Sequence, residues 1–157
     1  MHKTKIDIAK GKREKLIALL NQRLADALDL KSQSKQAHWN VKGMNFIALH
    51  ELFDQVATEL DPMVDDIAER VTTLGGTALG TVRVAAQNSS LAEYPLEISE
   101  GADHVDALSN ALADFGKKVR ADIDTADELG DADTADLLTG VSRSIDKLLW
   151  FVEAHLQ

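Results

Sequence analysis

The sequence predicts an all-α fold, in which four long amphipathic helices form one bundle and a long connection joins the second helix to the third. Apolar residues recur at steps of three and four in four long segments, and no segment shows the alternation typical of strands. At 157 residues, 45% of them hydrophobic, the chain is long enough for one domain with a sizeable core. We therefore expect a single domain over residues 1–157.

The first two helices are predicted over about residues 11–40 and from about residue 45 to 74, with Gly43 in the turn between them. The core face of the first helix contains Leu16, Leu20, Leu24, Ala27 and Leu28. The core stripe of the second contains Phe46, Leu49, Phe53, Val56, Leu60, Val64, Ile67, Val71 and Leu74. Pro62 lies within the second helix, where a proline costs about 3 kcal/mol unless the helix kinks.

Glycines at 75, 76 and 80 end the second helix, and residues up to about 98 form a long crossover with room for a short helix. One long crossover between the second and third helices is the ferritin-like arrangement, whereas an up-down-up-down bundle would need only short loops. The third helix, about 99–128, presents Val105, Leu108, Leu112, Phe115 and Val119. The fourth, about 133–155, presents Leu138, Val141, Ile145, Leu148 and Val152, with Asp133 as its N-cap.

The charge of the chain is unevenly distributed. The formal net charge is -9, yet the first fifteen residues carry six basic against two acidic side chains, so that the remainder carries -13. A short basic arm over about residues 1–10 would attract DNA by releasing counterions, or it is simply a solvated terminus. The absence of cysteine excludes disulfides and thiolate metal sites. No apolar run is long enough to span a membrane, and we expect a cytoplasmic protein.

Potential metal ligands flank the core stripe of the second helix. His50 and Asp54 lie one turn apart, as do Asp65 and Glu69 further along. Because residues 50 and 65 are separated by about 22 Å of helix, one chain cannot bring both pairs to one ion. Two copies packed antiparallel about a two-fold axis near residue 60 would bring them together, which predicts two equivalent sites across a homodimer.

A mixed set of imidazole and carboxylate ligands suits ferrous iron, manganese or zinc and serves calcium poorly. From the spacing alone, a second interpretation stays open, in which these side chains are solvated or ion-paired. Arg70 follows Glu69 directly and is interpreted as a structural ion-pair partner. His104 has no paired ligand at helical spacing, so we expect it to be structural.

The segment around these ligands resembles the paired signatures of the Dps family, the mini-ferritins named as DNA-binding proteins from starved cells. The matching residues are His38, Trp39, Val41, Gly43, Leu49, His50 and Asp54, then Asp65, Ile67, Ala68, Glu69, Arg70, Leu74, Gly75 and Ala78. The resemblance continues through residues 78–81, Tyr94-Pro95-Leu96, Asp103-His104 and the run from Thr134 to Phe151, and covers almost the whole chain beyond residue 15.

The resemblance implies an intersubunit ferroxidase centre, with His38, His50 and Asp54 from one subunit and Asp65 and Glu69 from its two-fold partner. Members of the family form twelve-subunit shells that oxidise ferrous iron, preferentially with hydrogen peroxide, and store the ferric product. The resemblance also gives Trp39 a role as an electron donor that quenches radicals, whereas packing alone would explain it as a core or interface aromatic.

An acidic cluster surrounds the start of the fourth helix. Capping and favourable charge at the positive end of the helix dipole would explain it. By family resemblance, this region lines pores on three-fold axes, where rings of aspartates draw cations inward. Asp136 is the best candidate, followed by Asp131 and Asp133.

The sequence therefore predicts a Dps-type ferroxidase and iron-storage shell that protects the cell from peroxide. Two alternatives stay open. The first is a mainly architectural, DNA-binding Dps protein whose iron chemistry is secondary. The second is a metal-binding bundle that stores nothing and takes zinc or manganese at the same ligands.

Overall fold

The computed structural model describes residues 1–157, and every regular element in it is helical. The elements are α1 (Lys10–Asn40), α2 (Phe46–Thr73), α3 (Val82–Asn88), α4 (Gly101–Glu128), α5 (Ala132–Glu153) and the short 3-10 turn η1 (Ala154–Leu156). The predicted bundle of four long helices is confirmed, and so is the short helix in the crossover. None of these helices is both long and apolar enough to cross a lipid bilayer.

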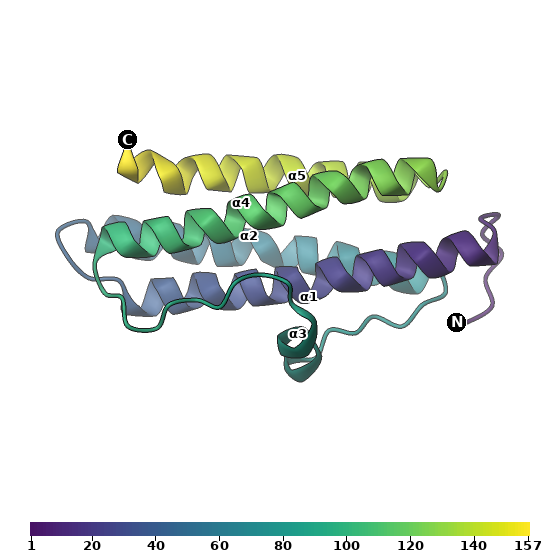
Figure 1. Ribbon diagram of the computed structural model, residues 1–157, viewed down its shortest axis with the longest axis horizontal. Helices are drawn as coiled ribbons and strands as arrows, with labels where there is room; N and C mark the ends of the chain where they lie inside the picture. The colour runs from purple at the N-terminus through teal and green to yellow at the C-terminus, as the bar shows by residue number, and fades with distance from the viewer.

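The long helices form two pairs, α1 with α2 and α4 with α5, which pack together along the length of the molecule (Figure 1). The crossover leaves the end of α2 near the N-terminus and returns to the opposite end, where α4 begins (Figure 1). The small helix α3 stands beside α1 on the outside of the bundle (Figure 1). This connection along the whole bundle gives the chain its ferritin-like topology.

The core contains 27 buried apolar residues, contributed by all four long helices and the crossover. The predicted stripes of α4 and α5 are fully buried, and those of α1 and α2 are buried with three exceptions. Leu28 and Val64 are half-buried, and Phe46 is 42% exposed. Phe46 is the first residue of α2, so the buried face of the helix does not include its first residue.

Two details of the helices differ from the sequence interpretation or extend it. Asp133 was predicted as the N-cap of the last helix, and this prediction is wrong. The helix begins at Ala132, and the side chain of Asp131 accepts a hydrogen bond from the Thr134 amide at 3.2 Å. Pro62 lies within α2, which continues through it from Phe46 to Thr73.

The N-terminal segment is fastened to the end of α2. The amide of His2 donates to the Gly75 carbonyl at 2.7 Å, and Arg13 donates to the carbonyls of Leu74 and Ile8. Gly75 has a φ of 89°, and a Cβ there would lie 2.8 Å from the His2 carbonyl oxygen. The close approach of the two backbones therefore requires glycine at this position.

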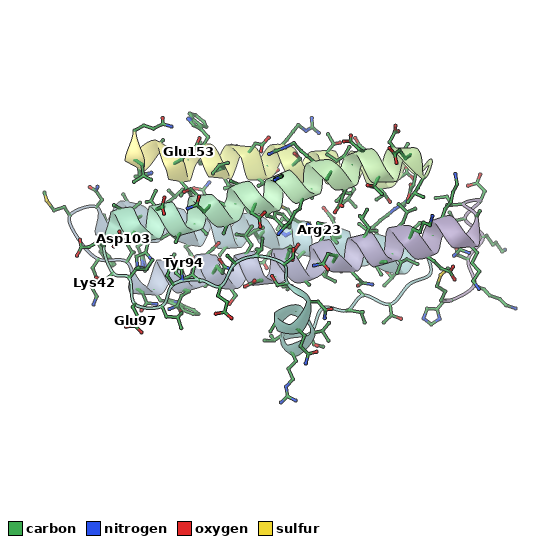
Figure 2. The ribbon with its side chains drawn as sticks, in the orientation of Figure 1. Arg23, Lys42, Tyr94, Glu97, Asp103 and Glu153 are labelled. Carbon is green, nitrogen blue, oxygen red and sulfur yellow. The ribbon has the colours of Figure 1, made fainter.

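A buried charged cluster joins α1, α4 and the crossover. Arg23 pairs with Asp26 at 3.1 Å and with Asp122 of α4 at 2.9 Å. Asp26 also accepts a hydrogen bond of 2.6 Å from the Ser90 amide in the crossover. Figure 2 shows Arg23 between α1 and α4. One arginine facing two carboxylates leaves an excess negative charge in this cluster.

Replacing Asp122 with Asn is expected to stabilise the protein by about 1 kcal/mol at pH 7.5. Burial raises the pKa of Asp122 to about 6. The positive charge of Arg23 lowers this pKa, and the negative charge of Asp26 raises it further. Since the folded-state pKa lies above the ordinary value of 3.8, the contribution of Asp122 favours folding at low pH and is lost as the pH rises through 6. Thermal denaturation of the wild type and the variant between pH 4 and 8 measures the difference.

The two stability curves should approach each other as the pH falls from 8 towards 4, because Asp122 of the folded chain becomes protonated below about pH 6. Asp124→Asn, at an exposed position on the same helix, is the matched control and should follow the wild type. Equal stability of the wild type and Asp122→Asn at every pH would contradict the prediction.

Candidate metal centre

Two histidines from different helices form the centre of the candidate site. His38 lies near the end of α1 and His50 in the second turn of α2. Their rings stack with centroids 3.7 Å apart and an angle of 22° between the planes. Nδ1 of His38 lies 2.7 Å from the His50 carbonyl oxygen, and Nδ1 of His50 lies 2.8 Å from the His38 carbonyl oxygen. Each imidazole is thus fixed by the backbone of the residue that carries the other.

These contacts determine the tautomer of both rings. A carbonyl oxygen only accepts hydrogen bonds, so Nδ1 carries the proton in each ring and donates it. The lone pair of a neutral imidazole then lies on Nε2, the atom left for a metal ion. An imidazole whose other nitrogen donates to a carbonyl is the arrangement typical of metal-ligating histidines. The stacked pair therefore offers two imidazole nitrogens as donors, each with its tautomer fixed by the backbone.

Asp54 lies one turn beyond His50 on α2 and is held by a lysine of α1. Lys35 Nζ lies 2.5 Å from Asp54 Oδ1. The hydrogen bond from Lys35 lowers the pKa of Asp54, and the charges of Lys35, His38 and His50 act in the same direction. Sequence reasoning missed Lys35, although its place three residues before His38 puts it on the same face of α1. The carboxylate is ionised near neutral pH and is occupied by an ammonium group.

The second predicted pair, Asp65 and Glu69, lies further along α2. Both side chains are exposed, and neither makes a hydrogen bond or an ion pair within the chain. No group of three or more histidine or acidic side chains in the chain is arranged to hold a metal ion. The structure therefore brings His38 and His50 into contact, with Asp54 one turn beyond His50, and within one chain neither these three nor Asp65 and Glu69 form a complete metal-binding group.

Comparison with known proteins shows the family to which the chain belongs. A family model of the ferritin-like domain matches residues 17–157. The DNA protection during starvation protein of Agrobacterium fabrum is 47% identical over 156 residues, covering 99% of this chain and 96% of the relative. The chain belongs to the Dps family.

Solved structures of the Dps family have the same fold. The Mycobacterium smegmatis Dps, in a tetragonal form, superposes with a TM-score of 0.94 at 30% identity, covering 99% of this chain and 94% of the other. The Dps of Vibrio cholerae O1 superposes with a TM-score of 0.92 at 25% identity, covering 100% of this chain and 98% of the other. The latter is described as a member of a broad superfamily of ferritin-like diiron-carboxylate proteins.

Trp39, the predicted radical quencher of the Dps type, does not belong to the core of this chain. Its side chain is 66% exposed, so of the two packing roles predicted for it only the interface role is left. Lys35 Nζ lies 5.6 Å from the centroid of the Trp39 ring. Lys35 thus contacts both the indole and the candidate ligand Asp54.

The three aspartates that Dps resemblance assigns to a pore have different surroundings. Asp131 is buried and pairs with Arg70 at 2.7 Å, which confirms the structural role predicted for that arginine. Asp133 is exposed and lies 3.9 Å from Arg70. Asp136 is exposed at the edge of a hollow of about 450 Å³ between α2 and α5, which Glu59 and Asp66 also line. Asp136 therefore has the freest carboxylate of the three.

Proposed function

We propose that this Dps-family chain is a ferroxidase and iron-storage mini-ferritin. It oxidises ferrous iron, preferentially with hydrogen peroxide, and retains the ferric product inside a dodecameric shell in the cytoplasm, protecting the cell from oxidative stress. The observation that carries the proposal is the reciprocal histidine pair, because it leaves the Nε2 atoms of two imidazoles available to a metal ion, near an ionised carboxylate. The description of the Vibrio relative as a diiron-carboxylate type supports iron as the metal.

The centre is completed across a two-fold axis of the dimer. Asp65 and Glu69 of one subunit supply the carboxylates that the histidine side of the other lacks. Their exposure and their freedom from internal partners support this assignment. Two such centres form per dimer, and six dimers form the shell.

The chemistry follows from holding two ferrous ions beside one peroxide. Two ferrous ions supply two electrons, so hydrogen peroxide is reduced to two hydroxide ions while both irons become ferric. No hydroxyl radical is released when both electrons arrive together. Histidine and carboxylate ligands suit iron, and also zinc or manganese, but zinc is redox-inert and would block the reaction.

Exposed aspartates around a pore draw ferrous ions towards the ferroxidase centre and into the interior of the shell. Asp136 is our strongest candidate for an acidic ring around a pore, and Asp133 a weaker one. Asp131 already balances Arg70, so it contributes least. Repeated copies of a carboxylate around a narrow opening raise the local concentration of ferrous ions.

The test is anaerobic loading of the assembled protein with ferrous iron, followed by substoichiometric hydrogen peroxide. Oxidation of about two irons per peroxide, on a particle of dodecamer size, is the expected result. Absorbance measures the ferric product and light scattering measures the particle. A correctly assembled particle that oxidises no iron beyond the protein-free rate would refute the proposal.

Replacing Lys35 with Met is expected to tighten zinc binding by the assembled protein about threefold, because an exposed ion pair of this kind is weak and competes only modestly with the metal for the carboxylate. The ammonium of Lys35 must leave Asp54 before that carboxylate can bind an ion. Zinc is used because it binds without being oxidised. Titration calorimetry at neutral pH measures the dissociation constant.

Lys31→Met is the matched control, because Lys31 makes the same kind of ion pair with Asp61, which is not a candidate ligand. The control should bind zinc like the wild type. Weaker zinc binding by Lys35→Met than by Lys31→Met would show that Lys35 assists the site instead of competing for it.

A second candidate function, DNA binding through the basic arm of about residues 1–10, is favoured by the exposed lysines near the N-terminus. Lys3, Lys5, Lys10, Lys12 and Lys15 are all exposed, although His2 and Arg13 fasten the segment to the end of α2. Retention on DNA that weakens steeply with salt would support this function. Absence of retention at low salt would exclude it.

A further inference from the structure

Tyr94 and His104 form a hydrogen-bonded pair between the crossover and α4. The Tyr94 hydroxyl lies 2.7 Å from His104 Nδ1, and the two rings are nearly parallel with centroids 6.0 Å apart. Figure 2 shows Tyr94 at the end of the bundle where Lys42 and Asp103 also lie. Tyr94 is half-buried and is the one tyrosine of the chain, while His104 is only 1% exposed.

The surroundings of His104 make it a base for the phenol. Burial lowers the pKa of His104, so that the ring is neutral near pH 7. The charge of Asp103 and the backbone carbonyls of Asn40 and Ile98 favour a proton on the ring, which we assign to Nε2. Nε2 is buried and makes no hydrogen bond of good geometry. Nδ1 then accepts from the Tyr94 hydroxyl and has a lone pair for its proton.

The pair also lies beside residues that neighbour the candidate metal ligands in the chain. The His104 ring is 6.4 Å from the ring of Phe53, centroid to centroid, and Phe53 immediately precedes Asp54 on α2. Asn40, whose carbonyl acts on His104, follows His38 by two residues on α1. His104 therefore lies against one residue that adjoins Asp54 in the chain and one that follows His38 by two positions.

Other hydrogen bonds also hold the crossover against α1. The Ser90 amide donates to Asp26 at 2.6 Å, and the Ser89 hydroxyl donates to Asp29 at 2.5 Å. Gln33 donates to the carbonyl of Ala92 at 3.0 Å, two residues before Tyr94. With three such contacts from α1, a further bond from Tyr94 adds little to the attachment.

We infer that Tyr94 is an electron donor to the metal centre, and that His104 takes its proton when it is oxidised. The inference rests on the proposed function and concerns a centre that holds one ferrous ion instead of two. Hydrogen peroxide still needs two electrons to become two hydroxide ions. The ferrous ion gives one and becomes ferric, and Tyr94 gives the other. Its phenolic proton moves to His104 Nδ1, leaving a neutral tyrosyl radical beside an imidazolium.

This step removes the hydroxyl radical that a lone ferrous ion and peroxide would otherwise release. Burial raises the pKa of Tyr94, so the phenolate is not available as a donor near neutral pH. Loss of the electron must therefore be accompanied by transfer of the proton to a neighbouring base. His104 is the base within hydrogen-bond distance, and it is the positioning residue of the pair.

The test is electron paramagnetic resonance after rapid freezing. The assembled protein is loaded anaerobically with one ferrous ion per centre, mixed with one equivalent of hydrogen peroxide and frozen within milliseconds to seconds. We expect a tyrosyl radical in the wild type. Growth on ring-deuterated tyrosine should narrow the signal, and since Tyr94 is the one tyrosine, the label assigns the radical to it without any mutation.

Variants separate the electron donor from the base. Tyr94→Phe removes one oxygen atom and should abolish the radical. Glutamine at 104 can accept the hydrogen bond but cannot take the proton, so His104→Gln should lower the radical yield by about tenfold or more. Trp39→Phe, which removes the exposed indole near Lys35, should leave the tyrosyl signal unchanged.

Ferric absorbance recorded on the same samples distinguishes failure of this inference from failure of the proposed ferroxidase function. Iron oxidation with no radical altered by deuterated tyrosine would overturn the inference and leave the ferroxidase function intact. A radical that shows the hyperfine pattern of tryptophan and is lost in Trp39→Phe would overturn it as well. No protein-dependent iron oxidation would refute the proposed function, and the inference with it.

Discussion

Replacing His50 with Ala is expected to slow peroxide-dependent iron oxidation about 100-fold and leave the particle assembled, since losing even a supporting partner of a metal ligand costs 10- to 100-fold. The substitution removes one imidazole donor. It also removes the hydrogen bond from His50 Nδ1 to the His38 carbonyl. The His38 ring loses its stacking partner as well. The site of the variant then has one histidine ligand, His38, and that ring no longer stacks on another. Stopped-flow absorbance after anaerobic iron loading measures the rate.

His155→Ala is the matched control, because His155 lies in the exposed turn after α5 and bonds only to the carbonyl of Phe151. It should oxidise iron at the wild-type rate. Light scattering on both variants verifies assembly. A wild-type rate in an assembled His50→Ala particle would show that the centre lies elsewhere.

Replacing Arg70 with Ala is expected to destabilise the protein by about 3 kcal/mol, because it leaves a buried carboxylate without its partner. Asp131 is 3% exposed, and Arg70 donates to it at 2.7 Å and to the Thr134 hydroxyl at 2.9 Å. For a chain of this size, the loss corresponds to a decrease of about 6–12 °C in the melting temperature. Calorimetry at pH 7.5 measures it.

Acid should reduce the difference between the wild type and Arg70→Ala. Burial alone would raise the pKa of Asp131, but hydrogen bonds from Arg70 and Thr134 outweigh it and hold the pKa below the ordinary 3.8. A depressed pKa stabilises the folded chain above that value, and the contribution is lost as the pH falls through the folded-state pKa. Arg143→Ala, at an exposed arginine of α5 without an ion pair, is the control and should change little. An unchanged melting temperature in Arg70→Ala would contradict the prediction.

The helices and most of the core could be predicted from the sequence because burial imposes a periodicity that local inspection can read. The stripes of α4 and α5 are buried at every predicted position. The prediction that Phe46 is buried was wrong, because periodicity does not reveal where a helix extends beyond the bundle. The N-cap was wrong because Asp131 and Asp133 are chemically equivalent choices, and the partner that decides between them, Arg70, lies on another helix.

The candidate site was predictable in its ligands but not in its internal contacts. Spacing on one helix pairs His50 with Asp54, and family resemblance adds His38. The reciprocal hydrogen bonds depend on how α1 and α2 lie against each other, which no spacing reveals. Lys35 was missed for the same reason, since its carboxylate partner lies on the other helix. Tertiary contacts between helices are what local patterns leave undetermined.

The mutual support of His38 and His50 has a consequence for how such a site is inherited. Each ring bonds to the backbone carbonyl of the other residue and stacks on the other ring, so a chain that loses one imidazole keeps the hydrogen bond of the second and loses its stacking partner. Loss of either imidazole also removes one of the two nitrogen donors, so the histidine that is left contributes less to metal binding. We therefore expect the histidines at positions 38 and 50 to be kept or lost together during evolution.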